Sequence, residues 1–429
     1  DTPLTHDVAR ELCQRAGATV MIEGTIAALG SQYVLGLSAL NCSTGDAFAQ
    51  ELVTADGKDK VLGALGDAAS RLRSKLGESR ASHERYDVPL AQATTSSLEA
   101  LKAGSRGYLA FGKYDIPSAI AYFEHAVRLD SSFAVAYALL AELQDLTGDS
   151  ARAFENTRKA YELSGRVTEN ERYYISQAYC SRVTGDYDKA LLIARQWAND
   201  YPRDSAILGT MGRAFSRLGR YEEALAATLE SIRIEPTITS YLVAAYYPIE
   251  LNRFDQARDL IRQSRERGFD SPQFKYYLWL MSFMENDPAG MALNRDSPIE
   301  IEGILAFSQG RLSALRVFNR RQMESHMRGG RNNSAALINA ETALSEALAG
   351  NAGEARRSAV AAHAMSTDRQ TQELAALSLA LAGDAARARD LAADLKRRFP
   401  ESTTVRFYFL PAIEAAVSLR GRNPQKAIE

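Results

Sequence analysis

The fold is decided by Gly185-Asp186-Tyr187-Asp188-Lys189-Ala190, because near-copies of this stretch recur along the chain. The alanines that close the copies are spaced 34, 37, 34 and 33 residues apart; they are Ala119, Ala153, Ala190, Ala224 and Ala257. Two antiparallel helices with two tight turns fill roughly 34 residues, and such a hairpin cannot bury its apolar face alone. The interval therefore predicts helical hairpins that stack in series as a solenoid.

A glycine is expected where the first helix of each hairpin ends. Gly148, Gly185 and Gly219 each stand five residues before one of the repeated alanines. Glycine takes the left-handed conformation that ends a helix without a steric penalty. The small alanine then lets the returning helix approach its partner closely.

The clearest repeat unit runs from Ser205 to Pro236. In its first helix, Met211-Gly212 is a close-packing pair, Phe215 supplies an aromatic ring and Gly219 forms the turn. In its second helix, Tyr221 supplies another ring, Ala224 is the small residue and Pro236 stops the helix. This pattern resembles the tetratricopeptide (TPR) motif. The resemblance implies a mainly α fold, a TPR-like α-solenoid of about nine to ten helical hairpins.

We expect the superhelix to occupy residues 98–429. The repeats become irregular around 286–332, where Met291 and Leu315 replace the alanines and Pro288 and Pro298 bracket a short helix. Regular spacing returns after Gly350. The last repeat is predicted to be truncated, because the chain stops as its second helix begins.

The residues before the repeats follow another pattern. Segments 19–29, 33–40 and 48–53 alternate as strands do, with helical spacing at 5–16 and along 61–76. We predict a small α+β domain at residues 1–86 with an antiparallel sheet, and expect it to lack its first element. Residues 87–97, with Pro89 and a Thr-Thr-Ser-Ser run, are the predicted linker.

This first region carries a second resemblance, in the stretches 17–26, 32–34 and 41–46 (GATVMIEGTI, QYV and NCSTGD). It resembles the small α/β domain that precedes TPR arrays in bacterial regulators, especially TPR-containing serine/threonine kinases and cyclase-like or winged-helix transcription regulators of acidobacterial type. The resemblance implies a catalytic or DNA-binding module upstream of Asp1, often with a membrane span. It leaves the compartment open between the extracytoplasmic side of an anchored parent and the cytoplasm.

The sequence predicts no catalytic, cofactor-binding or metal-binding residue. It has no Walker loop, kinase catalytic motifs, G-x-S-x-G or H-E-x-x-H. Its histidines are scattered, and Cys13, Cys42 and Cys180 are expected to behave as small apolar residues rather than form a disulfide or zinc site. A net charge of −2 gives no general attraction to nucleic acid. No apolar run approaches the ~20 residues that cross a bilayer, so we expect no membrane insertion.

The remaining candidate is a concave groove lined by the first helices of successive hairpins. Matching motif positions in repeats three to five gives its predicted residues: Arg172, Tyr179, Arg182, Arg213, Arg217, Tyr246 and Glu250. Tyrosine and arginine are often energetic at interfaces. We therefore hypothesise a groove that grips an acidic protein or peptide segment, or a C-terminal carboxylate, through its arginines. The alternative is that these side chains are solvated helix positions.

Three function classes follow. The first is a non-enzymatic protein-protein interaction scaffold, the sensing or docking region of a larger signalling protein. The second is the regulatory part of a kinase whose catalytic domain lies upstream. The third is an oligomerisation module, with an apolar patch at Trp279, Phe283 and Met284 that forms a homo-oligomer. A basic stretch at 311–331 has only Phe318 as an interleaved aromatic, which favours a solvated helix over nucleic-acid binding.

Overall fold

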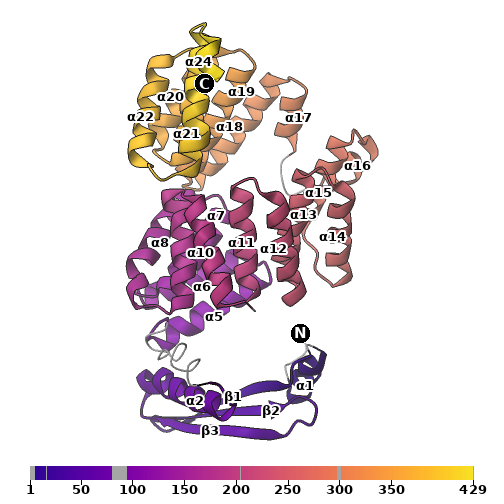
Figure 1. Cartoon of the computed structure of the whole chain (residues 1–429), viewed down its shortest axis with the longest axis vertical. Coiled ribbons are helices and arrows are strands. Elements are labelled where there is room, and N and C mark those ends of the chain that lie inside the picture. Colours follow the sequence, from indigo (N-terminus) through magenta and orange to yellow (C-terminus); the bar gives the residue numbers. More distant parts are fainter. Residues whose placement is uncertain (1–4, 16, 80–93, 203, 297–300, 429) are drawn as a thin grey trace. The chain divides into compact units, whose positions relative to one another are not determined.

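The computed structural model describes residues 5–15, 17–79, 94–202, 204–296 and 301–428. Figure 1 shows the helices and strands of the chain, and contacts within the chain divide it into two compact units. The first unit comprises residues 1–107, 121–137 and 162–172, and the second comprises 108–120, 138–161 and 173–429. Most of the predicted linker, residues 87–93, lies outside the described residues.

The first unit contains a three-stranded antiparallel sheet, as predicted. Its strands are β1 (Val20–Leu29), β2 (Gln32–Asn41) and β3 (Ala47–Ala55), in the order β1-β2-β3. Helix α1 (His6–Arg15) precedes the sheet, and a short turn η1 (Lys58–Lys60) leads into α2 (Val61–Lys75) after it. Gly30 forms the β1–β2 turn with a φ of 62°, a conformation that suits glycine.

Helix α2 covers one face of this sheet because alternate strand residues are apolar. Leu35 and Ala55 pack on Val61 at the start of the helix, and Ala39 and Ala49 pack on Leu72 near its end. Leu98, the first residue of α5 (Leu98–Gly112), also contacts the Leu35 cluster. The sheet and the start of the first repeat thus share one core.

The expectation for the cysteines is wrong for two of them. Cys13 of α1 and Cys42, just after β2, form a disulfide with Cα atoms 5.8 Å apart. Cys180 is free and buried, as expected of a small apolar residue. The pairing escaped prediction because residues 29 apart in sequence meet only when α1 folds back on the end of β2.

After α5 the chain continues as helices joined by short turns. The further elements are α6 (Ile116–Leu129), α7 (Ala134–Leu146), α8 (Ser150–Leu163), η2 (Ser164–Arg166), α9 (Glu169–Tyr179) with its π-helical extension η3 (Cys180–Thr184), α10 (Tyr187–Asp200), α11 (Ser205–Arg217), α12 (Tyr221–Ile234), α13 (Ile238–Glu250), α14 (Phe254–Glu266), α15 (Pro272–Met284), α16 (Pro288–Leu293), α17 (Glu302–Ser308), α18 (Leu312–Arg328), α19 (Asn332–Leu348), α20 (Ala352–Met365), α21 (Arg369–Leu381), α22 (Ala385–Arg398), η4 (Val405–Phe409), α23 (Leu410–Arg420) and α24 (Pro424–Ile428). Taken two at a time from α5, the described helices make ten successive pairs, in line with the predicted nine to ten.

The repeated residues play the predicted local roles. Gly148, Gly185 and Gly219 have φ values of 78°, 72° and 71°, and each ends the first helix of a pair. The five repeated alanines are fully buried: Ala119, Ala153, Ala190, Ala224 and Ala257. The alanines therefore recur about every 34 residues because each is buried where neighbouring helices pack together.

Two apolar cores organise the second unit. One joins α10 to α15 through Phe215, Tyr241 and Phe274. The other joins α19 to α23 through Leu379 and Leu395. Of the helices between them, α16 and α17 are short and α18 is long. We call residues 301–428 (α17–α24) the C-terminal array.

The apolar patch predicted at Trp279, Phe283 and Met284 does not include Trp279, which is buried. Trp279 is only 1% exposed and stacks on Phe283, with ring centroids 5.4 Å apart. Met284, at the helix end, is 48% exposed. The hydrophobic run of α15 serves the core, because α13, α14 and α16 pack around this helix. Among the described helices, none is both long enough and apolar enough to cross a membrane.

Candidate binding cavity

The C-terminal array touches the turns of two early repeats in the second unit. The main-chain N–H of Thr403 donates to the carbonyl oxygen of Gly185 over 3.0 Å, and the N–H of Tyr187 donates to Thr403 Oγ1 over 3.1 Å. Ser334 Oγ donates to the carbonyl oxygen of Gly148. We call this set of contacts the seam.

Arg369, at the start of α21, is the central side chain of the seam. Its guanidinium donates to Thr404 Oγ1 over 2.7 Å and to Ser402 Oγ over 3.1 Å, and it lies 3.5 Å from Glu373. It also reaches the hydroxyl of Tyr187. Burial raises the pKa of Glu373, and the charge of Arg369 opposes that rise only in part. In the seam, the largely buried guanidinium of Arg369 therefore has hydrogen-bond acceptors for its N–H groups.

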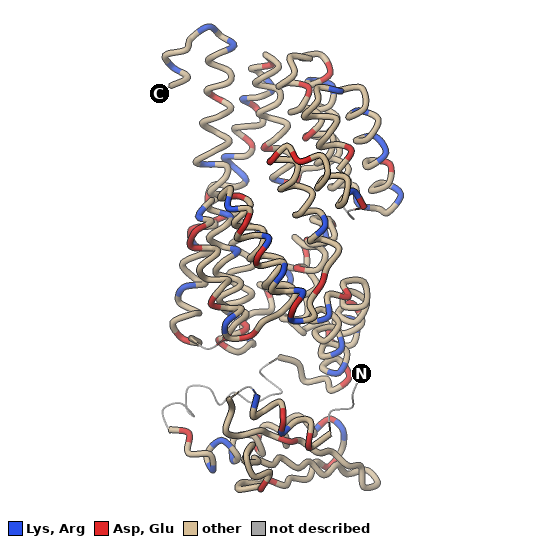
Figure 2. Tube along the Cα trace, turned by 90° about the vertical axis from the view of Figure 1, so that its right-hand side faces the viewer, with Lys and Arg blue, Asp and Glu red and all other residues tan. Residues whose placement is uncertain are grey.

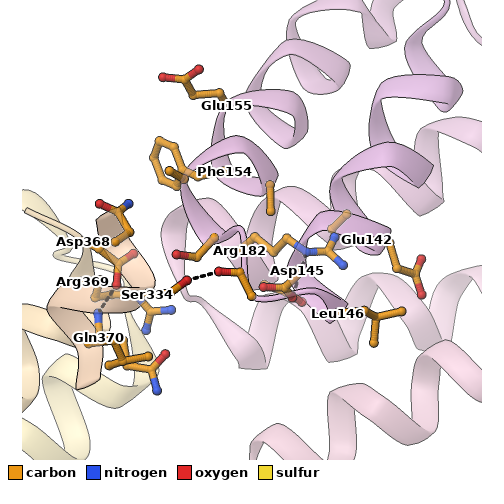
Figure 3. A pocket seen from close by; sticks show the side chains of 18 of the residues that line it. Glu142, Asp145, Leu146, Phe154, Glu155, Arg182, Ser334, Asp368, Arg369 and Gln370 are labelled. Atoms are coloured by element: carbon orange, nitrogen blue, oxygen red, sulfur yellow. Dashed lines mark hydrogen bonds and ion pairs between the residues drawn. The ribbon is translucent and has the colours of Figure 1, made fainter. Parts of the chain in front are cut away.

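A cavity of about 970 Å³ adjoins the seam. One wall comes from the early repeats, chiefly α7, α8, the α9–η3 segment and α11; the other comes from α18, α19, α21 and α22 of the C-terminal array. In Figure 3, Arg182 and Asp145 lie on the first wall, and Ser334 and Arg369 on the second. The cavity thus lies where segments distant in sequence meet.

The arginines of the first wall are already paired, with the exception of one described below. Arg182 lies 3.4 Å from Asp145, and Arg213 lies 3.6 Å from Glu142, which also accepts a hydrogen bond from the hydroxyl of Tyr174. Burial acts to raise the pKa of Glu142, but the charges of Arg213 and Arg182 and the Tyr174 hydrogen bond outweigh it and hold this pKa below its usual value. Glu142 is therefore a carboxylate at neutral pH.

Three charged side chains of the cavity remain open. Glu155 of α8, Arg217 of α11 and Glu341 of α19 have exposed side chains that make no hydrogen bond or ion pair with any described residue. Although Glu341 is open to the cavity, the surrounding chain displaces enough water to raise its pKa. These groups are available to a ligand.

Apolar side chains lie beside these charges. Leu146 and Phe154 are 55% and 36% exposed, and both line the first wall. Leu337 and Ile338 of α19 line the second. A ligand could therefore bury apolar surface and meet charged groups in the same place.

The structure gathers only part of the predicted groove. Arg182, Arg213 and Arg217 line the cavity, whereas Arg172, Tyr179, Tyr246 and Glu250 do not. Tyr179 stacks on Tyr161 at 4.0 Å, and Arg172 lies on α9 outside the cavity. Tyr246 packs between Tyr247 and Tyr277, and burial, followed by a hydrogen bond with Glu250, raises the pKa of Tyr246.

Two functional candidates, Glu155 and Glu341, were missed by the repeat register. Glu155 stands on a second helix, and Glu341 belongs to an array far along the chain. Motif positions describe contacts between neighbouring repeats. They therefore cannot predict which residues of distant repeats line the same cavity.

The basic stretch at 311–331 is partly paired in the structure. Arg316 donates to both carboxylate oxygens of Glu346, over 2.6 and 2.9 Å, and Arg331 donates to His326 Nδ1. Figure 2 shows basic and acidic residues interspersed along the helices of the second unit. In the described chain, no group of His, Cys, Asp and Glu is placed to hold a metal ion.

Comparison with known proteins bears on the repeats. A model of the tetratricopeptide repeat family matches residues 205–238. Three solved structures are similar. A thermophilic TPR protein of Thermus thermophilus is 18% identical with a TM-score of 0.32, and the match covers 42% of this chain and 98% of that one. MamA of Desulfovibrio magneticus is 16% identical with a TM-score of 0.26, over 41% of this chain and 99% of that one, and a Rap protein complexed with Competence and Sporulation Factor is 14% identical with a TM-score of 0.37, over 67% of this chain and 86% of that one.

No curated protein matches the chain. Proteins built from tetratricopeptide repeats act as scaffolds for protein-protein interaction and bind peptides or proteins. Residues 205–238 therefore match a tetratricopeptide repeat, and helix pairs with buried alanines lie on both sides of it.

Proposed function

We propose that this chain is a non-enzymatic scaffold that binds a segment of another protein in the cavity beside the seam. The observation that carries the proposal is the cavity itself, which presents open charged groups and exposed apolar side chains together. Its volume of about 970 Å³ suits a few residues of an extended chain rather than a whole domain.

The seam supports this proposal by fixing the walls. Thr403 bonds to Gly185 and Tyr187, and Arg369 bonds to the hydroxyl of Tyr187, so these contacts hold the C-terminal array against the early repeats. A preformed site loses less conformational freedom on binding, which favours affinity. Of the predicted groove residues, Arg182, Arg213 and Arg217 line the cavity, and we retain Arg217 as a candidate contact because the other two are paired with Asp145 and Glu142.

The larger context is also a proposal. The resemblance of the first region supports a place in a bacterial signalling protein, with a kinase as one candidate parent. The Cys13–Cys42 disulfide favours an oxidising compartment, because disulfides are rare in the reducing cytosol. We therefore favour the extracytoplasmic alternative over the cytoplasmic one.

Selection of short random peptides by phage display on the immobilised chain tests the proposal. Selected peptides are then titrated against Ala151→Trp, which fills the cavity, and Ala289→Trp as its control. Both alanines are exposed second residues of their helices, α8 and α16, but only Ala151 lines the cavity. We expect Ala151→Trp to weaken binding at least about tenfold, equivalent to about 1.4 kcal/mol, with Ala289→Trp unchanged. Equal affinity for both variants would refute the proposed site.

A further inference from the structure

The charges of the cavity indicate which ligands it accepts, once paired groups are separated from open ones. Of its five arginines, Arg182, Arg213 and Arg369 are held by the contacts described above. Arg398 is held by Asp394 at 3.2 Å and by the carbonyl oxygen of Thr367 at 2.8 Å. Arg217 is left as the open cation among the described residues of the cavity.

The acidic side chains divide differently. Glu142 and Asp145 pair with arginines, and Asp368 caps α21 by accepting from the N–H groups of Gln370 and Thr371. Glu155 and Glu341 are left. The groups open to a ligand are thus two carboxylates against one guanidinium, the reverse of the arginine-rich groove expected from the repeat register.

On this basis we propose that the segment bound in the cavity carries a lysine or arginine next to apolar residues. The proposal rests on the proposed function and names the chemistry of its partner. A cation beside Glu341 would form a charge-assisted hydrogen bond with a carboxylate that is already partly dehydrated. The aliphatic stem of that lysine or arginine would pack on side chains such as Leu146 and Phe154.

An acidic segment meets an unfavourable arrangement in the same cavity. To use Arg213 or Arg182 it must displace Glu142 or Asp145, and displacing Glu142 would leave a largely buried carboxylate without its arginine. It would also face the open carboxylates of Glu155 and Glu341. Repulsion and lost pairing together discriminate against acidic ligands.

Fluorescence anisotropy with three synthetic peptides tests this inference. The peptides share one apolar leucine frame and differ at two central positions, which are both lysine, both glutamine or both glutamate. We expect the lysine peptide to bind at least about tenfold more tightly than the glutamate peptide at low salt. The double variant Glu155→Gln/Glu341→Gln should remove that preference, whereas Arg217→Gln should leave it intact or increase it.

Glu302→Gln is the matched control, because Glu302 is an exposed glutamate of the C-terminal array that does not line the cavity. It should behave as the parent chain does, and thermal melts should show that all variants fold. Tighter binding of the glutamate peptide, or an unchanged preference in the double variant, overturns the charge inference but leaves cavity binding standing. Binding of all three peptides that Ala151→Trp does not weaken, or binding of none, overturns the proposed function as well.

Discussion

Thr403 donates its main-chain N–H to the carbonyl oxygen of Gly185 over 3.0 Å, and through this bond the approach to η4 is fixed to the turn before α10. Gly185 permits the approach because it has no Cβ: an added one would lie 2.7 Å from Cζ of Arg369 and 2.8 Å from Oγ of Ser402. The cavity wall therefore depends on a glycine that the repeat pattern already uses as a helix stop.

Gly185→Ala should lower the free energy of unfolding more than Gly219→Ala does. Both glycines have nearly the same φ, 72° and 71°, so both variants lose about 1–2 kcal/mol to the left-handed backbone. No atom lies within 4 Å of a Cβ at Gly219, so only Gly185→Ala adds a clash, of about 1–3 kcal/mol. Urea unfolding measures the difference, and equal losses would show that the seam does not constrain Gly185.

Glu346→Gln should reduce the loss of stability in acid. Its side chain is 3% exposed, and the hydrogen bond from Arg316 holds its pKa below the usual value, against the effect of burial. A carboxyl group whose folded-state pKa is depressed stabilises the fold above its unfolded pKa of about 4.3 and loses that contribution as pH falls through the folded value. Melting temperatures at neutral and acidic pH should therefore converge in Glu346→Gln, with Glu302→Gln matching the parent chain. A variant with the parent's full acid dependence would contradict this assignment.

The disulfide predicts a definite thiol count. Of the three cysteines, Cys13 and Cys42 are joined and Cys180 is free. Alkylation of the unfolded, unreduced chain should therefore modify a single thiol, and prior reduction should expose all three. Closing a loop between residues 29 apart should contribute about 3.6 kcal/mol to the first unit, so reduction should lower its melting temperature. Three reactive thiols without reduction would remove the pairing and the argument for an oxidising compartment.

Trp279→Ala should destabilise the fold rather than alter assembly. The ring is 1% exposed and stacks on Phe283, so its removal should cost about 3–5 kcal/mol. Circular dichroism melts and light scattering separate the two effects. Loss of oligomers with an unchanged melt would instead return Trp279 to the surface patch that the sequence suggested.

The repeat architecture could be predicted because its signal is local. Gly148, Gly185 and Gly219 end helices through their own backbone conformation, and Ala190 and Ala224 pack against neighbours in sequence. The strands of the first unit were predictable for the same reason, since alternation reports a half-buried sheet.

The cavity could not be predicted in this way. Arg369 and Tyr187 lie in repeats whose own patterns give no sign that they meet. The ion pair between Arg213 and Glu142 likewise joins α11 to α7. The repeat pattern predicted Arg213 as a donor to a ligand, but in the structure this arginine is already paired. Contacts between distant repeats determine which charged side chains are left unpaired. Such contacts leave no periodic pattern in a single sequence.

Photo-crosslinking tests the central claim most directly. The photoreactive residue p-benzoylphenylalanine replaces Leu146 in the cavity or Leu192 on α10, two leucines that are each 55% exposed, and the chain is irradiated with the lysine peptide. We expect an adduct at position 146 that Ala151→Trp abolishes, and none at position 192. Equal labelling of the two positions, or labelling at 192 alone, would contradict the account.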